Sequence, residues 1–389
     1  MNAKPPFFSV VMPTKNRSHI LRYAIQSILW QTFEDFEIIL VDNSDTEETQ
    51  TLVDQFNDSR IRYFRTGNLT MANNWDYGIK QASGEYITIV ADKHVFRKKA
   101  LSQIYQGIEQ SSKNIITWKH TSFIRNGDNG YLESWAKEGD PFILSTEELV
   151  KYLLKDGRNN FRRFRRNLPR GYNSATHRSL VDKIISSLGF ACTQITPDYT
   201  FGAAQIALEK EIFVMRTVLF ATDPTISIGR SFRKKEDMKK HREDLGAKED
   251  FYTFVPVKTD SLISNLIYND VLNIREKLGG NLASHNLDIP AYFGVLYDEI
   301  QERAYRNHQD MTDELGEWQQ SLKQQPNEIQ QLVFNEQAEV DALYKPAPLF
   351  KRGRYWLKKL LRVRNSKPVT LEKKMFPNSL EAFNYEDNL

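Results

Sequence analysis

The first ninety residues alternate between short apolar runs and longer amphipathic stretches. Apolar runs at 7–12, 36–41, 61–64 and 85–91 have the composition of buried strands. The stretches between them repeat apolar side chains at helical spacing, most clearly at 18–30 and 71–82, and a more polar helix is expected up to about residue 56. This alternation, with short connections, predicts a parallel sheet that helices cover on both faces.

Polar side chains follow three of these predicted strands at the point where each strand ends. Residues 14–17 follow the first strand, Asp42 and Asn43 the second, and Asp92 and His94 the fourth. Loops are commonly polar, so one such cluster carries little information, but three at one edge of a sheet favour a binding site. Asp92 and His94 are two residues apart, so in an extended segment they share a face and provide an oxygen and a nitrogen ligand for a divalent cation.

Residues 97–235 carry further strand and helix signals. The last clear strand is predicted at 212–220. Between 158 and 170 the chain has six arginines with two phenylalanines among them. Two interpretations of this run remain open, a solvated loop or a contact with phosphate or with an acceptor molecule.

Residues 236–345 are expected to form an all-helical extension. Helices are predicted at 261–278, from Pro290 to about 320, and at 327–343. In the tail, 346–389, Lys and Arg alternate with Trp and Leu. Such a basic amphipathic pattern is typical of a helix on a membrane surface, and equally of a helix packed on the same protein.

Composition narrows the class of protein. The chain is 40% hydrophobic and 26% charged with a net charge of +3, which favours anionic ligands slightly and does not indicate nucleic acid. The single cysteine, Cys192, excludes an internal disulfide and a multi-cysteine zinc site. No signal peptide and no apolar run of about 20 residues is visible, so we expect a cytoplasmic protein, soluble or peripheral at the membrane.

Two common nucleotide-binding motifs are missing from the sequence. There is no G-x-G-x-x-G after the first strand, which disfavours a dinucleotide-dependent dehydrogenase. There is no G-x-x-x-x-G-K-[ST] either, which disfavours a P-loop NTPase. A nucleotidyltransferase is also disfavoured, because no Gly-rich loop bearing Lys or Arg follows the first strand.

The first half of the chain resembles the family 2 glycosyltransferases, which have the GT-A fold. Residues 9–17 are similar to the opening strand and nucleotide loop of that family, 24–44 to its next helix and strand, and 71–86 to the segment before its metal motif. The resemblance implies a GT-A domain over 1–235, with a Rossmann-like mixed sheet flanked by helices. It also implies inverting transfer of a sugar from a nucleotide-sugar, expected to be a UDP-sugar, to an acceptor hydroxyl in cell-surface polysaccharide or glycan synthesis.

The same resemblance assigns roles to individual residues. Asp198 stands about a hundred positions after the metal motif, where such enzymes carry the general base, although an acid in a first helical turn is also a common dipole partner. The residues expected to bind the nucleotide-sugar are Pro13, Thr14, Asn16, Arg17, Asp42, Asn43, Asn74 and Asp92.

The metal motif departs from the usual acid-x-acid pattern of the family. It reads Asp92-Lys93-His94, with Asp92 and His94 as the expected metal ligands. A carboxylate with an imidazole favours Mn²⁺ over Mg²⁺, which prefers oxygen ligands. Lys93 is unusual, and its ammonium either pairs with phosphate or indicates a site that depends less on metal.

The expected partners are a nucleotide-sugar donor and a glycan or lipid-linked glycan acceptor, with no nucleic acid. Residues 346–389 are a candidate for peripheral membrane contact. Lys93 also motivates an alternative from another class, a GT-A scaffold protein that binds a nucleotide-sugar without turnover.

Overall fold

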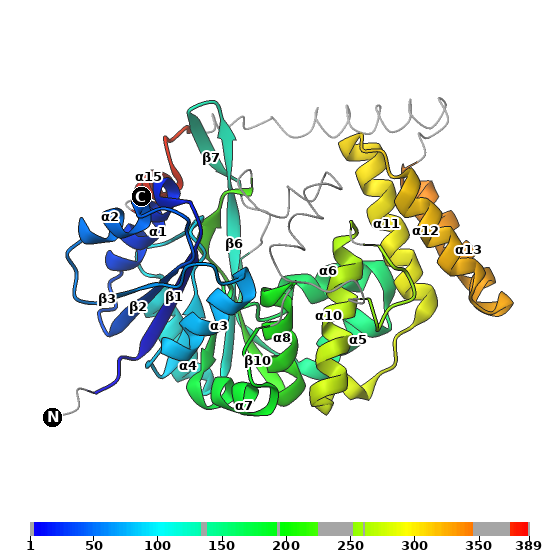
Figure 1. Cartoon of the computed structure of the whole chain (residues 1–389), viewed down its shortest axis with the longest axis horizontal. Helices are drawn as coiled ribbons and strands as arrows, with labels where there is room; N and C mark the ends of the chain where they lie inside the picture. Colours follow the sequence, from blue (N-terminus) through cyan, green and yellow to red (C-terminus); the bar gives the residue numbers. More distant parts are fainter. Residues whose placement is uncertain are drawn as a thin grey trace.

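One mixed sheet of ten strands organises the chain, and helices cover both of its faces (Figure 1). The structure is a computed structural model and describes residues 4–133, 138–192, 195–224, 252–259, 261–344 and 374–387. The strands are β1 (Phe8–Thr14), β2 (Phe36–Asp42), β3 (Ile61–Arg65), β4 (Tyr86–Ile89), β5 (His94–Phe96), β6 (Ile115–Asn126), β7 (Asn129–Glu133), β8 (Phe142–Ser145), β9 (Ser174–His177) and β10 (Glu211–Thr222). Their order is β3-β2-β1-β4-β9-β6-β10-β5, with β7 on β6 and β8 on β10.

The sheet is parallel only in part. β1 pairs in parallel with both β2 and β4, β2 pairs in parallel with β3, and β6 pairs in parallel with β10. β9 lies between β4 and β6 and runs antiparallel to both. The parallel sheet expected from the first ninety residues is confirmed for β1 to β4, and the later strands make the whole sheet mixed, as the family resemblance implies.

Helices connect the strands in the order that the apolar spacing predicts. The helices of this part are α1 (Ser18–Leu29), α2 (Glu48–Asp54), α3 (Met71–Gln81), α4 (Ala100–Ser111), α5 (Thr146–Leu154), α6 (Gly157–Asn167), α7 (Arg178–Leu188) and α8 (Pro197–Leu208). Side chains alternate along β1, so Val10 packs in a core on one sheet face with α1 and α4, while Val11 packs in a second core on the other face. Because both faces are covered, the strands read as continuous apolar runs.

Three predicted elements differ from the structure. The strand expected at 85–91, with an extended segment on to His94, is two strands, β4 and β5, separated by a turn at Asp92–Lys93, so Asp92 and His94 do not lie on one face of an extended segment. The arginine run up to Arg166 lies in the helix α6, whose buried face is made by Phe161 and Phe164, three residues apart, and Arg170 follows the helix. The helix expected from Pro290 to about 320 is divided at His308, which has a φ of 53°.

The C-terminal extension shares a core with the sheet. Its elements are α10 (Ile263–Leu278), a 3₁₀ turn (Gly280–Ser284), α11 (Ile289–Asn307), α12 (Thr312–Lys323) and α13 (Asn327–Tyr344). Val11 of β1 belongs to the same buried cluster as Tyr268 and Trp318 of the extension. The Tyr268 hydroxyl also donates to the Leu153 carbonyl oxygen at 3.1 Å. The extension is thus packed as part of the same hydrophobic unit, beside α6 and α8 (Figure 1).

Part of the predicted tail packs back on the sheet. Helix α15 (Ser379–Asp387) lies beside β5 and β7, and Phe376 pairs with Gly130 through two backbone hydrogen bonds of 2.7 Å. Arg97 binds Asp387 at 2.7 Å and stacks 4.5 Å from the Phe383 ring. The basic amphipathic stretch of the tail, 349–364, lies outside the described residues. Within the described ranges, no helix combines the length and the apolar content that crossing a bilayer requires.

A buried carboxylate fixes the start of β4 against β1 and β2. Glu37 accepts hydrogen bonds from Ser9 Oγ at 2.6 Å, from Ser83 N–H at 2.7 Å and from Arg62 at 2.7 Å. Burial alone would raise the pKa of Glu37, but these donors outweigh it and hold the pKa below its usual value. Gly84 passes so close that a Cβ there would lie 2.6 Å from the Ser9 nitrogen.

Replacing Gly84 by Ala is expected to lower the free energy of unfolding by about 1–3 kcal/mol, because the added methyl group meets backbone atoms of β1. Urea denaturation measures this. The matched control is Gly316→Ala in α12, where nothing lies within 4 Å and alanine should stabilise by up to about 1 kcal/mol. Equal effects of the two substitutions would contradict the close approach of Gly84 to β1.

Candidate functional site

Asp92 is a buried carboxylate at the edge where β1, β2 and β4 end. Thr14 Oγ1 donates to its Oδ2 at 3.4 Å, and Arg17 Nη1 lies 3.4 Å from its Oδ1. Burial raises the pKa of Asp92, while the charges of Arg17 and Lys93 oppose that rise. Both contacts are long for hydrogen bonds, so this carboxylate keeps acceptor capacity for a ligand.

His94 begins β5 immediately after the turn. Its Nδ1 accepts a hydrogen bond from Ala91 N–H at 3.2 Å, and its ring lies 5.2 Å from Tyr172 and 4.8 Å from Phe220. Burial lowers the pKa of His94 well below its usual value, so the imidazole is neutral. A neutral ring that accepts at Nδ1 carries its proton on Nε2.

Lys93 connects Asp92 electrostatically with a second acid, Asp198. Burial lowers the pKa of the Lys93 ammonium, and the charges of Asp92 and Asp198 oppose that fall. Asp198 occupies the first turn of α8 after Pro197, and burial raises its pKa although Arg170 and the backbone N–H groups of Tyr199 and Asp198 stabilise the ionised form. The structure thus brings the expected general base to the expected metal motif.

Arg170 orders the region around Asp198. Its guanidinium lies 3.9 Å from Asp198 Oδ2, stacks 4.7 Å from the Tyr172 ring, and donates to the Tyr199 hydroxyl at 3.0 Å. Arg165 Nε donates to the same hydroxyl at 2.9 Å. Tyr172 touches both His94 and Arg170, so it joins the two halves of the site.

Other residues expected to bind the nucleotide make hydrogen bonds within and between the neighbouring loops. Asn16, with a φ of 55°, donates to Asp45 at 2.7 Å and accepts from Asp45 N–H at 2.9 Å. Asn74 Nδ2 donates to the Val41 carbonyl oxygen at 3.0 Å and to Asn43 Oδ1 at 3.2 Å. These bonds tie the loops after β1 and β2 to α3. Pro13 is buried within β1, opposite Val41.

Asp42 lies opposite Thr14 in the parallel register of β1 and β2. It is fully buried, and it accepts from Ser44 N–H at 2.9 Å and from the Tyr63 hydroxyl at 2.8 Å. Burial, followed by this carboxylate, raises the pKa of Tyr63. Each oxygen of Asp42 has one protein partner, and because the side chain is fully enclosed a ligand reaches it only after a change in the loops around it.

Two acids without a family motif also reach this region. Asp223 directly follows β10, binds Arg125 at 2.5 Å, and contributes to the field around Lys93. Its signal is visible in the sequence, because it ends an apolar strand as Asp42 does. Asp270, from α10, accepts from Thr196 N–H at 2.9 Å and from the Thr196 hydroxyl. No sequence signal indicates Asp270, since its role depends on how α10 packs on α8.

The two expected metal ligands, Asp92 and His94, are not equally suited to bind a metal ion. Asp92 fits, because it is a carboxylate with weak partners. His94 as placed has its proton on Nε2, so it can bind a metal only by giving up that proton or its bond to Ala91. Within the described residues, no three His, Cys, Asp or Glu side chains form a ready-made metal cage.

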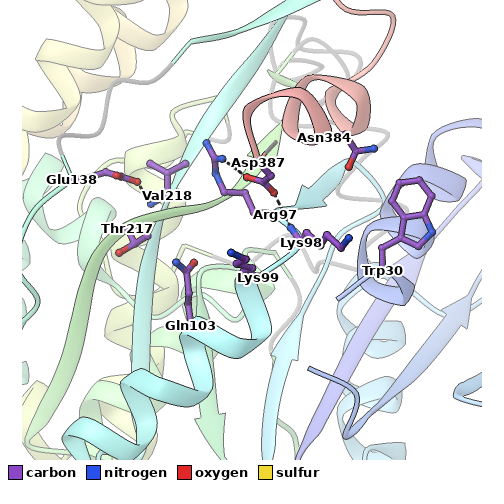
Figure 2. Close-up of a pocket in the computed structure, with 10 residues that line it drawn as sticks. All are labelled: Trp30, Arg97, Lys98, Lys99, Gln103, Glu138, Thr217, Val218, Asn384 and Asp387. Atoms are coloured by element: carbon purple, nitrogen blue, oxygen red, sulfur yellow. Dashed lines mark hydrogen bonds and ion pairs between the residues drawn. The ribbon is translucent and has the colours of Figure 1, made fainter. Parts of the chain in front are cut away.

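A pocket of about 750 Å³ lies elsewhere, between α4, α15 and the middle of β10 (Figure 2). Arg97, Lys98, Trp30 and Asp387 are among its lining residues, and none of the ten belongs to the group around Asp92 and Asp198. The Arg97–Asp387 ion pair accounts for part of its charge. We therefore place the functional site at Asp92 and Asp198 and not in this pocket.

Comparison with known proteins finds glycosyltransferases among the relatives of this chain. Residues 9–184 match the model of glycosyl transferase family 2. A segment of 115 residues is 39% identical to the GalNAc(5)-diNAcBac-PP-undecaprenol beta-1,3-glucosyltransferase of Campylobacter jejuni and covers 28% of this chain and 37% of that protein. Another, of 170 residues, is 27% identical to the glycosyltransferase GlyG of Streptococcus pneumoniae and covers 37% and 56%. The matches thus span less than two thirds of either relative.

A solved structure shares the fold over most of the chain. The crystal structure of residues 1–349 of S. aureus TarS in complex with UDP-GlcNAc aligns with a TM-score of 0.51 and 13% identity, covering 87% of this chain and 91% of that one. At this identity the likeness concerns the fold alone. It confirms the GT-A fold, followed by C-terminal helices.

The raised pKa of Asp270 predicts a pH-dependent stability, which tests whether this carboxylate is buried. Burial raises that pKa from 3.8 to about 7, so the contribution of this group to stability is complete below about pH 4 and is lost as the pH rises through about 7. Asp270→Asn keeps an acceptor for Thr196 N–H and removes the titration. The free energy of unfolding of the variant, measured by urea denaturation, should therefore increase relative to that of the wild type as the pH rises, by at most about 1.4 kcal/mol per pH unit. Asp182→Asn, on the exposed face of α7, is the control, and a pH-independent difference for Asp270→Asn would contradict the burial argument.

Proposed function

We propose that this chain, whose residues 9–184 match the model of glycosyl transferase family 2, is an enzyme that transfers a sugar from a nucleotide-sugar to a hydroxyl group of a glycan acceptor. The observation that carries the proposal is that a buried acid, Asp92, and a half-buried acid, Asp198, both act electrostatically on Lys93 at one end of the sheet. Ligands of open α/β sheets bind at this edge of the strands.

The donor binds at the ends of β1, β2 and β4. Arg17 and Lys93 provide positive charge for the diphosphate, and Thr14 provides a hydroxyl donor. Asp42 has acceptor capacity for an N–H group of the base. The remaining expected residues position the loops at this edge of the sheet: Pro13, Asn16, Asn43 and Asn74. A UDP-sugar donor is proposed by analogy, because the TarS structure of similar fold is described as a complex with UDP-GlcNAc.

Asp198 acts on the acceptor. Its carboxylate takes the proton from the acceptor hydroxyl as the oxygen attacks the anomeric carbon, and the bond from that carbon to the diphosphate oxygen breaks. Burial helps this role, because a raised pKa makes the carboxylate a stronger base. Arg170 holds the carboxylate in position from 3.9 Å. One displacement of this kind inverts the anomeric centre.

We also propose that Asp92 and His94 hold a divalent metal ion, Mn²⁺ in preference to Mg²⁺. When bound, this ion supplies positive charge that stabilises the departing diphosphate. Asp92 would provide the carboxylate, and His94 would provide Nε2 in the tautomer that carries its proton on Nδ1, which gives up the bond from Ala91 N–H. The undecaprenol-linked substrate in the name of the Campylobacter relative supports a lipid-linked glycan as the acceptor, and the tail, 346–389, is the segment proposed to contact the membrane.

Asp198→Asn is expected to keep nucleotide binding and to lower the rate of sugar transfer or donor hydrolysis by about 10²–10⁴, because the amide cannot accept the proton. Calorimetry with the nucleotide and a coupled assay for nucleotide release measure the two quantities. Asp128→Asn in the β6–β7 turn is the control. Nucleotide binding without any turnover in the wild type would favour the scaffold alternative.

The two ring nitrogens of His94 can be tested separately. In His94→Asn the amide stands near the place of Nδ1 and can accept from Ala91 N–H, whereas in His94→Gln it stands near Nε2 and can offer an oxygen to a metal. If His94 is a ligand, Mn²⁺-dependent nucleotide binding falls in His94→Asn and persists in part in His94→Gln. Titration of nucleotide binding with Mn²⁺ measures this, and the reverse order would assign His94 to structure alone.

A further inference from the structure

Three basic side chains from three different elements act on one another near the end of α6. Lys119 of β6 donates from Nζ to Asn167 Oδ1 at 3.0 Å, which places it against the end of α6 next to Arg166. Lys119 is also paired with Val218 of β10, directly after an irregularity in the ladder that contains Arg216. We call Lys119, Arg166 and Arg216 the basic row.

The charges of the basic row oppose one another. Burial, and then the charges of Arg166 and Arg216, hold the pKa of Lys119 below its usual value. Across the described part of the chain, no acidic side chain lies within 4 Å of a charged nitrogen of the row. Glu138, which accepts from Val218 N–H at 2.9 Å, is bound to the backbone beside the row. Like charges close to one another cost stability, so a ligand that supplies negative charge is the natural complement.

The basic row is connected to the general base and not to the donor edge. His120 follows Lys119 in β6, and the charges of Arg170 and Lys119, after burial, lower its pKa to about 4. Arg170 in turn lies 3.9 Å from Asp198, and its buried Nε has no hydrogen-bond partner among the described residues. Arg165 and Arg170, on either side of the Asn167 that holds Lys119, both donate to the hydroxyl of Tyr199, so the row lies next to the residue that follows Asp198.

We infer that the basic row binds negative charges of the acceptor, and that the acceptor is a glycan chain that carries phosphate groups. This inference rests on the proposed function, since it places the acceptor hydroxyl at Asp198. The donor has one diphosphate, which Arg17 and Lys93 already match at the other end of the site. A neutral glycan would supply no charge that complements the row. Two of its three side chains are arginines, whose planar donor pairs suit phosphate oxygens.

Binding of defined polymers to the full chain tests the inference. The probes are inorganic polyphosphate, hyaluronan as a carboxylate polymer, and dextran as a neutral polymer, each without added metal. The wild type should bind polyphosphate more tightly than hyaluronan and should not bind dextran. Polyphosphate should also slow hydrogen exchange in 117–121 and 161–167, on β6 and α6. Equal binding of hyaluronan or dextran, or protection elsewhere only, would overturn the inference.

Charge removal provides the matched variants. Lys119→Gln, Arg166→Gln and Arg216→Gln together should weaken polyphosphate binding by at least about tenfold and reduce its salt dependence by about 0.7 for each phosphate that is no longer neutralised. The control triple, Lys183→Gln, Lys210→Gln and Lys323→Gln, removes the same charge from exposed positions and should bind as the wild type does. Arg166→Gln alone, at an exposed helical position, gives the same direction if the triple variant is unstable. An equal loss in both triples would overturn the inference.

A further measurement separates the inference from the proposed function. The basic-row variant should hydrolyse the donor in the absence of polymer as fast as the wild type, because none of the three residues contacts the donor edge. If the wild type neither binds nor hydrolyses a nucleotide-sugar, the proposed function fails whatever the polymer does. If it does so and the variant retains polyphosphate binding, the inference alone fails.

Discussion

The parallel pairing of β1 with both β2 and β4 is the constraint on which the site depends. It sets Thr14 opposite Asp42 and continues past β4 through the bond from Val90 N–H to the Val11 carbonyl oxygen, 2.8 Å long. At the opposite end, Glu37 fixes the starts of the same strands through Ser9 and Ser83. Since both ends are fixed, the strand ends cannot slip, and Asp92 is carried to Thr14 and Arg17 although about eighty residues separate them.

The turn at Asp92–Lys93 determines where the site lies in the sheet. After it the chain leaves β4 and returns as β5 on the far side of β10, while β9 and β6 fill the space between. The site therefore spans the place where the sheet changes from sequential parallel strands to a mixed order, which is where α/β sheets bind ligands. This crossing also brings Tyr172 and Asp223 to a motif that lies far from them in the sequence.

Local patterns predicted the strands and helices, whereas contacts across the sheet could not be predicted. The apolar runs gave β1, β2 and β10 and most helices, and the strand-end polar residues with the family resemblance gave Asp92 and Asp198. The arginine run shows where pattern reading fails. Phe161 and Phe164 have helical spacing, but among six arginines two apolar residues were too few to indicate a helix. Pairing of β5 with β10, and of Asp270 with Thr196, depends on long-range packing that no local pattern encodes.

The helical extension takes part in the site through the residues that precede the base. Asp270 holds Thr196 at the start of α8, and α8 carries Asp198 two residues later. Because α10 packs in the same core as β1, movement of the extension would move the base relative to Asp92. The two acids, raised in pKa by the same burial, repel one another, as Asp198 also raises the pKa of Asp270. The packing of the extension on α8 keeps Asp198 and Asp270 close to one another in spite of this repulsion. The raised pKa of Asp198 therefore depends on that packing.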